Sequence, residues 1–412
     1  MYLRFMPASL TTYDADLKDN YGPGLKNALN NSHNVLNEVP INTQDIVGRR
    51  AVWAVHTLRS GSTGARGEGG TLPSAGSQGF TETTDKLVFN YHTIKVTGPA
   101  LHLTQGDEGA FVRALETELK GAETDIKNDR ARQQFGQALT NGTSLVSGVI
   151  GIVSGVTSTT FTMSTATKGE LRTFFVNETV DFYATASTTE RSNTPVGGYV
   201  VTGVNVATQT VTVSQALDAT VAVTDYVVRY GSYTFEINGL RHLVSADTYA
   251  GISTSTVPQW SSVIQGSSTT QLSEFVLNEA SEAVQTDGDG STPNIWICEF
   301  DQRRKLAAQL QAQKRYDGMQ TTLKSGWKGL DIAEGTLVVD RFCPTNNSWG
   351  LTTSDFARFV ALDWSWDDDS GSTLYKALDD SDAIQARYRV FDQLAATNRN
   401  SSVSLTLSTP SS

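Results

Sequence analysis

Histidine and cysteine, the side chains used most often for metal binding and nucleophilic catalysis, are few and scattered in this sequence. The 412 residues include five histidines and two cysteines. His56 and His92 lie in two strand-like segments, so they could face each other if those segments pair. Two histidines without a third ligand make a poor zinc site. We therefore interpret them as ordinary polar strand residues and predict no metal site.

The two cysteines, Cys298 and Cys343, have a spacing that matches neither a CxxC zinc motif nor a disulfide framework. Cys298 lies in NIWICEF (residues 294–300), a nearly unbroken apolar run that is typical of a buried strand. In such a run a cysteine behaves as a small hydrophobic residue and is a poor nucleophile. We predict two reduced thiols.

Three further segments resemble ligand-binding motifs but are incomplete. GARGEGG (64–70) has neither the GK[ST] of a phosphate-binding loop nor a full GxGxxG, and no helix pattern follows it. The acidic segment 363–382, read as a calcium loop from Asp367, has Ser372 where glycine is required and Leu378 where a bidentate glutamate is required. DGDGS (287–291) fails the same pattern. We predict a mobile glycine-rich tip and solvated acidic turns.

A catalytic constellation is therefore missing. No GxSxG nucleophile elbow occurs, and no nucleophile, base and orienting group can be assembled from these residues. We predict no catalytic residues and no cofactor, and we do not expect an enzyme.

Composition excludes two broad classes of partner. Lys and Arg number 32 and Asp and Glu number 43, which gives a net charge of −11. This charge disfavours electrostatic binding to phosphate backbones. The most apolar run, SLVSGVIGIVSGV (144–156), is too short and too rich in Ser and Gly to cross a bilayer. The start has no apolar segment of the kind that directs export. We expect neither a membrane anchor nor export.

The first hundred residues predict an arm followed by an extended ribbon. Residues 1–48 have turn formers without sustained periodicity, whereas 49–60 and 85–98 are rich in β-branched and aromatic residues. Seven glycines lie between residues 61 and 79, which indicates a long two-stranded ribbon with a flexible tip. Because an isolated ribbon is marginally stable and its edges pair readily, we predict a second copy as its partner. Arg66 and Glu68, at the tip, are our candidates for contacts between copies.

A long helix is predicted from 107 to 140, with about 50 Å of length at 1.5 Å per residue. Its apolar residues form two stripes on opposite sides, which must contact different surfaces. The first stripe comprises Phe111, Leu115, Leu119, Ala122 and Ile126, and the second comprises Ala131, Phe135, Ala138 and Leu139.

Beyond the helix, residues 143–232 predict an inserted small β-barrel or sandwich, since short Val and Thr alternations are separated by turn signals. The rest alternates helix and strand patterns, and two strands near the C-terminus are expected to complete a sheet. The predicted fold class is α+β.

This order of elements, together with the stretches NDRARQQFGQALTNGT (128–143) and PNIWICEFDQRRKLAAQLQAQKRYDG (293–318), resembles the major capsid protein of tailed double-stranded DNA bacteriophages, which has the Hong Kong 97 type capsid fold. The resemblance covers nearly all of the chain outside the inserted domain. It implies an N-terminal arm at 1–48, an extended β-loop at 49–98 and a spine helix of the peripheral domain at 99–142. It further implies an insertion at 143–232, peripheral segments at 233–263 and 383–412, the latter as closing strands, and an axial domain at 264–382.

The resemblance also implies a function. Copies of the chain would form pentamers and hexamers of an icosahedral shell that encloses double-stranded DNA without sequence-specific binding, in a virion assembled in the bacterial cytoplasm. A separate scaffolding protein, a portal and a decoration protein are the partners that it implies. Some members cross-link a loop lysine, but this tip has none and the nearest is Lys86, so no such bond is expected. The alternatives are an encapsulin-like nanocompartment shell and a β-rich surface-binding module.

Overall fold

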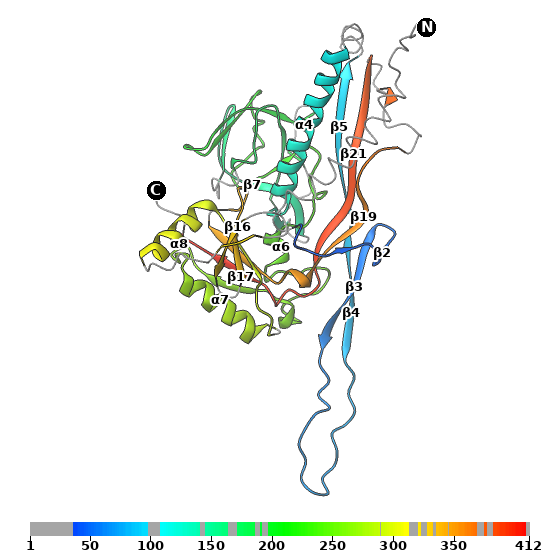
Figure 1. Cartoon of the computed structure of the whole chain (residues 1–412), viewed down its shortest axis with the longest axis vertical. Coiled ribbons are helices and arrows are strands. Elements are labelled where there is room, and N and C mark those ends of the chain that lie inside the picture. The colour runs from blue at the N-terminus through cyan, green and yellow to red at the C-terminus, as the bar shows by residue number, and fades with distance from the viewer. Residues whose placement is uncertain are drawn as a thin grey trace, which may run out of the picture.

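The computed structural model has an α+β architecture, as predicted, in which a narrow hairpin projects from a larger body (Figure 1). The residues that it describes are 36–97, 108–140, 145–163, 171–185, 190–191, 197–288, 290–312, 320–322, 328–332, 335–344, 346–368, 375–376 and 382–408. Most of the predicted arm lies outside these ranges. Within 36–48 the arm contributes two short strands, β1 (Ile41–Asn42) and β2 (Ile46–Val47).

The hairpin consists of β3 (Arg50–Leu58) and β4 (Gly79–Lys86), which pair antiparallel, with β2 beside the base of β3. The segment 85–98 does contain a strand, but the prediction that this strand pairs with 49–60 in the ribbon is wrong. After the buried residue Leu87, β5 (Val88–Thr97) enters a different sheet. His56 consequently lies opposite Phe80 rather than His92, so the two histidines do not face each other across the ribbon.

The second sheet contains β1, β5, β19 (Phe356–Trp366), β20 (Tyr375–Lys376) and β21 (Ala383–Ala396). β21 is its central strand, because it pairs antiparallel with β5 from Ala383 to Asp392 and with β19 on the other side. The long helix α4 (Glu108–Gln133) lies alongside this sheet (Figure 1). Ala122 and Ile126 pack there in a buried cluster with tryptophans of β19, so the predicted first stripe faces one surface at these two positions. The side chains of Phe111, Leu115 and Leu119 lie outside the described residues.

Helix α4 ends earlier than the predicted residue 140. The last turn tightens, with Phe135 N donating to Arg132 O at 3.0 Å and Gly136 N to Gln133 O at 2.9 Å. Gly239 also approaches so closely that a Cβ there would lie 2.3 Å from the backbone of Gly136. The next residues, Gln137–Thr140, form strand β6. The second predicted stripe is therefore not a helix face, because Phe135 follows α4, and Ala138 and Leu139 belong to β6. Phe135 does lie in a different core from Ala122 and Ile126, and its ring centroid is 5.6 Å from that of Trp349.

The segment 143–232 forms a small barrel together with β6, which lies before the predicted boundary. Its strands are β6, β7 (Leu145–Thr157), β8 (Thr160–Met163), β9 (Thr179–Tyr183), β10 (Tyr199–Asn205), β11 (Thr210–Val213) and β12 (Tyr226–Arg229). The order is β12-β9-β10-β11-β8-β7-β6, and the additional pairing of β12 with β7 closes the ring. The barrel has its own apolar core, in which Phe161 and Phe182 are fully buried.

The third sheet has the order β13 (Val263–Gly266), β22 (Val403–Thr406), β18 (Asn347–Leu351), β14 (Ile295–Cys298), β17 (Gly335–Val339), β16 (Lys328–Ile332) and β15 (Gln320–Thr322). Its helices are α7 (Glu274–Asp287), which Ser273 caps, and α8 (Phe300–Ala312). Short helical turns occur at α6 (Leu240–Leu243), η2 (Pro258–Trp260) and η3 (Thr353–Asp355). The sheets do not follow the predicted division at residue 382, since β19 pairs with β21 whereas β22 lies between β13 and β18.

The largest core joins the base of the hairpin to the body. Trp53 of β3 stacks on Phe359 of β19 with ring centroids 5.5 Å apart, and Ala51 and Val55 are buried in the same cluster. The inward-facing residues of β3 thus alternate with outward-facing ones, as expected for a strand with one covered face.

We predict that this anchoring can be measured by a pair of aromatic truncations. Trp53→Ala should lower the free energy of unfolding by about 3–5 kcal/mol, because it leaves a cavity in the main core. Phe80→Ala, on the same hairpin but 69% exposed, should change the free energy of unfolding of the monomer by about 0.5 kcal/mol or less. Urea denaturation measures both values. Equal effects would show that the hairpin base is not part of the core.

Candidate functional site

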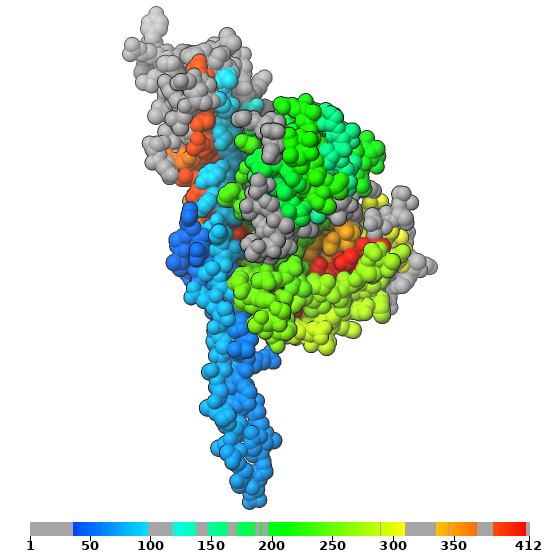
Figure 2. Space-filling model, turned by 180° about the vertical axis from the view of Figure 1, so that it is seen from behind, coloured from blue at the N-terminus to red at the C-terminus, as the bar shows by residue number. Residues whose placement is uncertain are grey.

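The hairpin has a buried half and an exposed half. Near the body, Ala51, Trp53 and Val55 are covered, but towards the tip the large apolar side chains are in solvent. Leu58 is 66% exposed and Leu72 is 80% exposed. Figures 1 and 2 show the hairpin extending well beyond the body from opposite directions of view. Within the described part of the chain, no surface of the same copy therefore covers the apolar residues of the distal half.

The loop at the tip, residues 59–78, is held by local hydrogen bonds. Arg66 Nε donates to Thr71 O at 2.9 Å, and Gly70 N donates to Gly67 O at 3.0 Å. Gly69 has φ +75°, a left-handed conformation that glycine adopts without strain. Arg66 and Glu68, the predicted contact residues, are both exposed at this tip. Their contact with a second copy stays a prediction.

A polar network fixes the other end of β4 to the body. Asp85 Oδ2 accepts hydrogen bonds from the Tyr249 hydroxyl at 3.1 Å and from Asn238 Nδ2. Gln393 Nε2 donates to the carbonyl of Lys86 at 2.9 Å. Burial raises the pKa of Asp85 to about 6, although the hydrogen bonds from Tyr249, the Lys86 backbone and Asn238 oppose the rise. The angle at which the hairpin leaves the body is thus set by side chains of distant segments.

Buried ion pairs connect α4 to its sheet. Arg130 is 2% exposed and pairs with Asp392 of β21, which also accepts from Arg358 Nε at 2.7 Å. Burial alone would raise the pKa of Asp392, but the two guanidinium groups hold it below its ordinary value.

A second set of ion pairs connects α4 to the barrel and to the segment after it. Arg132 pairs with Glu236 and, at 2.9 Å, with Asp129. Arg229 of β12 pairs with Asp129 and with Glu178. Burial opposes the ionised form of Asp129, yet Arg229 and Arg132 lower its pKa below the ordinary value. The charged end of α4 is therefore a junction between three parts of the molecule.

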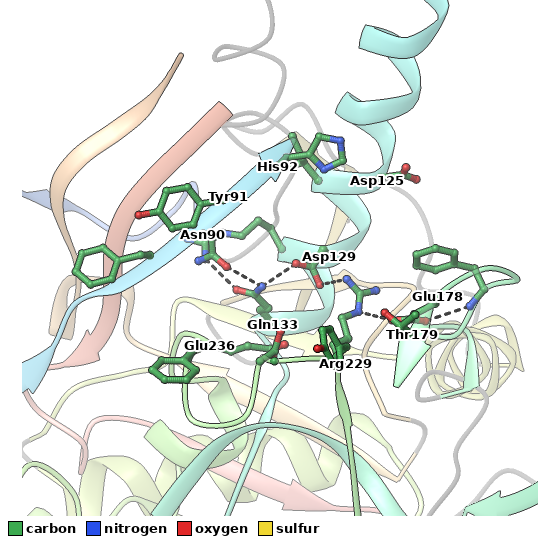
Figure 3. Close-up of a pocket in the computed structure, with 18 of the residues that line it drawn as sticks. Asn90, Tyr91, His92, Asp125, Asp129, Gln133, Glu178, Thr179, Arg229 and Glu236 are labelled. Atoms are coloured by element: carbon green, nitrogen blue, oxygen red, sulfur yellow. Dashed lines mark hydrogen bonds and ion pairs between the residues drawn. The ribbon is translucent and has the colours of Figure 1, made fainter. Parts of the chain in front are cut away.

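A cleft of about 490 Å³ lies at this junction, between α4, β5 and the barrel. Figure 3 shows Asp125, Asp129 and Gln133 on the helix, with Glu178 and Arg229 opposite them. Gln133 Nε2 bridges Asp129 Oδ2 at 2.8 Å and Asn90 Oδ1 at 3.2 Å. Burial lowers the pKa of His92 in the wall, although Asp125 and Asp129 oppose this, so His92 is neutral at pH 7.

Both cysteines lie among the described residues, as do many potential metal ligands. Within those ranges, no three His, Cys, Asp or Glu side chains are grouped so as to hold a metal ion. Cys298 is fully buried, as predicted, and burial raises the pKa of its thiol to about 12. Cys343 is also buried and free, and burial likewise raises its pKa. None of the helices described here is both long and apolar enough to cross a bilayer.

The cleft and the ion pairs were not predicted from the sequence. Only apolar residues of the helix were predicted to contact other surfaces, whereas Arg130, Arg132 and Gln133 are buried as well. Glu123 and Lys127, one turn apart on the same helix, form a partly exposed ion pair. A detectable signal was the loss of apolar residues on the first stripe after Ile126, where Asp129, Arg130 and Gln133 take the facing positions.

Comparison with known proteins gives distant structural neighbours. No protein-family model matches the sequence, and no curated protein matches it. The structure is similar to a chain of the cyanophage A-1(L) capsid asymmetric unit, with 14% identity, 91% of each chain covered and a TM-score of 0.49. It is also similar to a chain of Mycobacterium phage Adephagia, with 9% identity, 92% of this chain and 91% of that chain covered and a TM-score of 0.43. A third is the SrpI encapsulin of Synechococcus elongatus, with 7% identity, coverage of 89% and 84%, and a TM-score of 0.42.

We predict that Arg130→Ala destabilises the fold by about 3–5 kcal/mol, because Asp392 is then left buried with one guanidinium partner in place of two. Lys127→Ala removes a half-exposed pair on the same helix and should cost less than about 1 kcal/mol. Chemical denaturation at pH 7 gives both free energies of unfolding. If the two variants lose the same amount, the buried pair does not hold α4 to its sheet.

We also predict a pH dependence from Asp85. Its folded-state pKa of about 6 lies above the ordinary value of 3.8, so its contribution to stability is complete below pH 4 and is lost as the pH rises through 6. The free energy of unfolding of the wild type should fall relative to that of Asp85→Asn between pH 4 and pH 7, and the difference should then be constant. A difference that is independent of pH over this range would contradict the assignment.

Proposed function

We propose that this chain is the major capsid protein of a tailed double-stranded DNA bacteriophage, a shell subunit of the Hong Kong 97 type. The observation that carries the proposal is the hairpin, which leaves the body with exposed apolar side chains and is held at its tip by its own hydrogen bonds. A two-stranded ribbon alone is at best marginally stable, and its open edges pair readily with other chains. The simplest surface for the hairpin to pair with and pack against is that of a second copy of the chain.

The rest of the architecture fits the elements that such a subunit needs. We assign α4 and the β5–β19–β21 sheet to the peripheral domain, with α4 as the spine helix. The sheet of β14, β17, β18 and β22, with α7 and α8, is then the axial domain. The barrel is the insertion, and β3 and β4 form the extended loop.

Contacts that join different surfaces of identical subunits close into rings, and we propose pentamers and hexamers of an icosahedral shell on this basis. A standard contact buries about 1,600 Å² in total, and many such contacts act together in a shell. Arg66 and Glu68 are proposed to contact a neighbouring copy. The net charge of −11 suits a wall that encloses DNA without binding a particular sequence.

The location and the partners of the protein follow from the same proposal. The protein would be part of the virion capsid and would assemble in the cytoplasm of a bacterial host. A separate scaffolding protein, a portal and a decoration protein would be its partners. An encapsulin-like compartment, which would enclose protein cargo, is distinguished from a phage shell by the contents of the particles.

The test is electron microscopy and sedimentation of the full chain, expressed alone and with its neighbouring gene products. We expect capsomer rings or closed shells. Replacing residues 59–78 by an Asn-Gly turn should abolish them while the far-ultraviolet circular dichroism is kept, because the loop is outside the core. A matched control shortens the exposed turn 206–209 of the barrel, which should leave assembly intact.

Two outcomes would overturn the proposal. One is a wild-type chain that stays monomeric at high concentration with its partners present. The other is assembly by the loop-deleted chain at the concentration that the wild type requires. If the particles contained protein rather than DNA, the proposed function would change from a phage capsid protein to a nanocompartment shell protein.

A further inference from the structure

We propose that the cleft between α4, β5 and the barrel receives the hairpin tip of a second copy, with Arg66 of that copy against Asp125 and Asp129. This inference rests on the proposed function, since it names the surface on which the hairpin of a neighbouring subunit lies. It adds a role for the barrel, which forms one wall of the cleft.

The charge of the cleft favours a cation. Four carboxylates line it, from Asp125, Asp129, Glu178 and Glu236, against two guanidinium groups, from Arg130 and Arg229. Arg130 pairs with Asp392, and Arg132 pairs with Asp129 and Glu236, although Asp392 and Arg132 both lie outside the lining. Arg229 pairs with Asp129 and Glu178. Among the described residues, the negative charge of the cleft that no ion pair offsets is therefore that of Asp125. Asp125 is exposed at the helix surface, where an incoming guanidinium can reach it.

Aromatic side chains beside these carboxylates make arginine the better cation. Phe175, Tyr230 and Phe235 line the cleft from the side of the barrel and the segment after it, and Phe235 is 67% exposed. Arg229 already lies over the ring of Phe175, 5.5 Å from its centroid. A planar guanidinium both stacks on aromatic rings and pairs with carboxylates in two-pronged geometry.

Two polar atoms in the wall suit a polypeptide. Asn90 Nδ2 and Glu236 Oε2 are buried and have no hydrogen-bond partner in the described structure. A buried donor or acceptor without a partner costs about 1–3 kcal/mol. A peptide segment brings both carbonyl acceptors and N–H donors, so its backbone can satisfy both atoms.

The hairpin tip has the matching features. Its charged residues are Arg59, Arg66 and Glu68, which give residues 59–78 a net positive charge. Leu72 is exposed in the same loop and can cover an aromatic ring of the cleft. The chain from Leu58 to Arg66 spans up to about 26 Å when extended, which is enough to enter a cleft of this size from outside.

The first test is disulfide trapping in the assembled full-length chain. The variant Arg66→Cys with Asp125→Cys should give a ladder of covalently linked oligomers on non-reducing gels after mild oxidation. The two native cysteines are buried, so they should not contribute. The control pairs Arg66→Cys with Glu118→Cys, because Glu118 is exposed two turns earlier on the same face of α4 and outside the cleft. The control should give no ladder.

The second test is charge reversal. Arg66→Glu and Asp125→Arg should each raise the concentration needed for assembly about fivefold, and the double variant should restore it, because the pair is re-formed with opposite polarity. Glu118→Arg should leave that concentration unchanged. Particles that assemble but show neither the ladder nor the rescue would overturn this inference and leave the proposed function standing. A wild-type chain that forms no assembly would overturn both.

Discussion

A two-stranded ribbon that leaves its own body cannot bury its apolar side chains there, and this constraint governs the molecule. At the base of β3 the apolar side chains are buried, since Trp53 stacks on Phe359 inside the main core. Beyond Val55, Leu58, Leu72 and Phe80 are exposed, and no surface of the same copy covers them among the described residues. A monomer would expose this surface permanently, whereas a ring or shell of copies would cover it.

For such a ribbon to reach a neighbour in a fixed place, its base must be rigid. Asp85, Tyr249, Asn238 and Gln393 hold the end of β4 by hydrogen bonds from three distant segments. The receiving surface must be equally well defined. Buried ion pairs fix the positions of the elements that form this surface, because the pair of Arg130 with Asp392 holds α4 against β21. Asp129 and Arg229 tie the same helix to the barrel, so the cleft between them has a set shape.

Local patterns in the sequence predicted the elements that local physics determines. The glycine-rich tip between strand-like segments, a long helix with the buried residues Ala122 and Ile126, the barrel of short Val and Thr strands and the buried strand at Cys298 are all present. The early end of α4 was missed, because the backbone of Gly239, a hundred residues away, packs against Gly136. The partner of β5 could not be predicted either, since β21 lies near the other end of the chain and no local signal marks the pair. The cleft depends on Arg130 and Arg132 being buried, and only their distant acids, Asp392 and Glu236, make that possible.

The central claim is that a second copy covers the distal half of the hairpin. Amide hydrogen exchange of residues 56–82, compared between assembled particles and dissociated subunits, measures that coverage directly. The account predicts strong protection of these amides on assembly, while the exchange of the barrel core around Phe182 stays the same. Exchange of residues 56–82 that is equally fast in both states would contradict it.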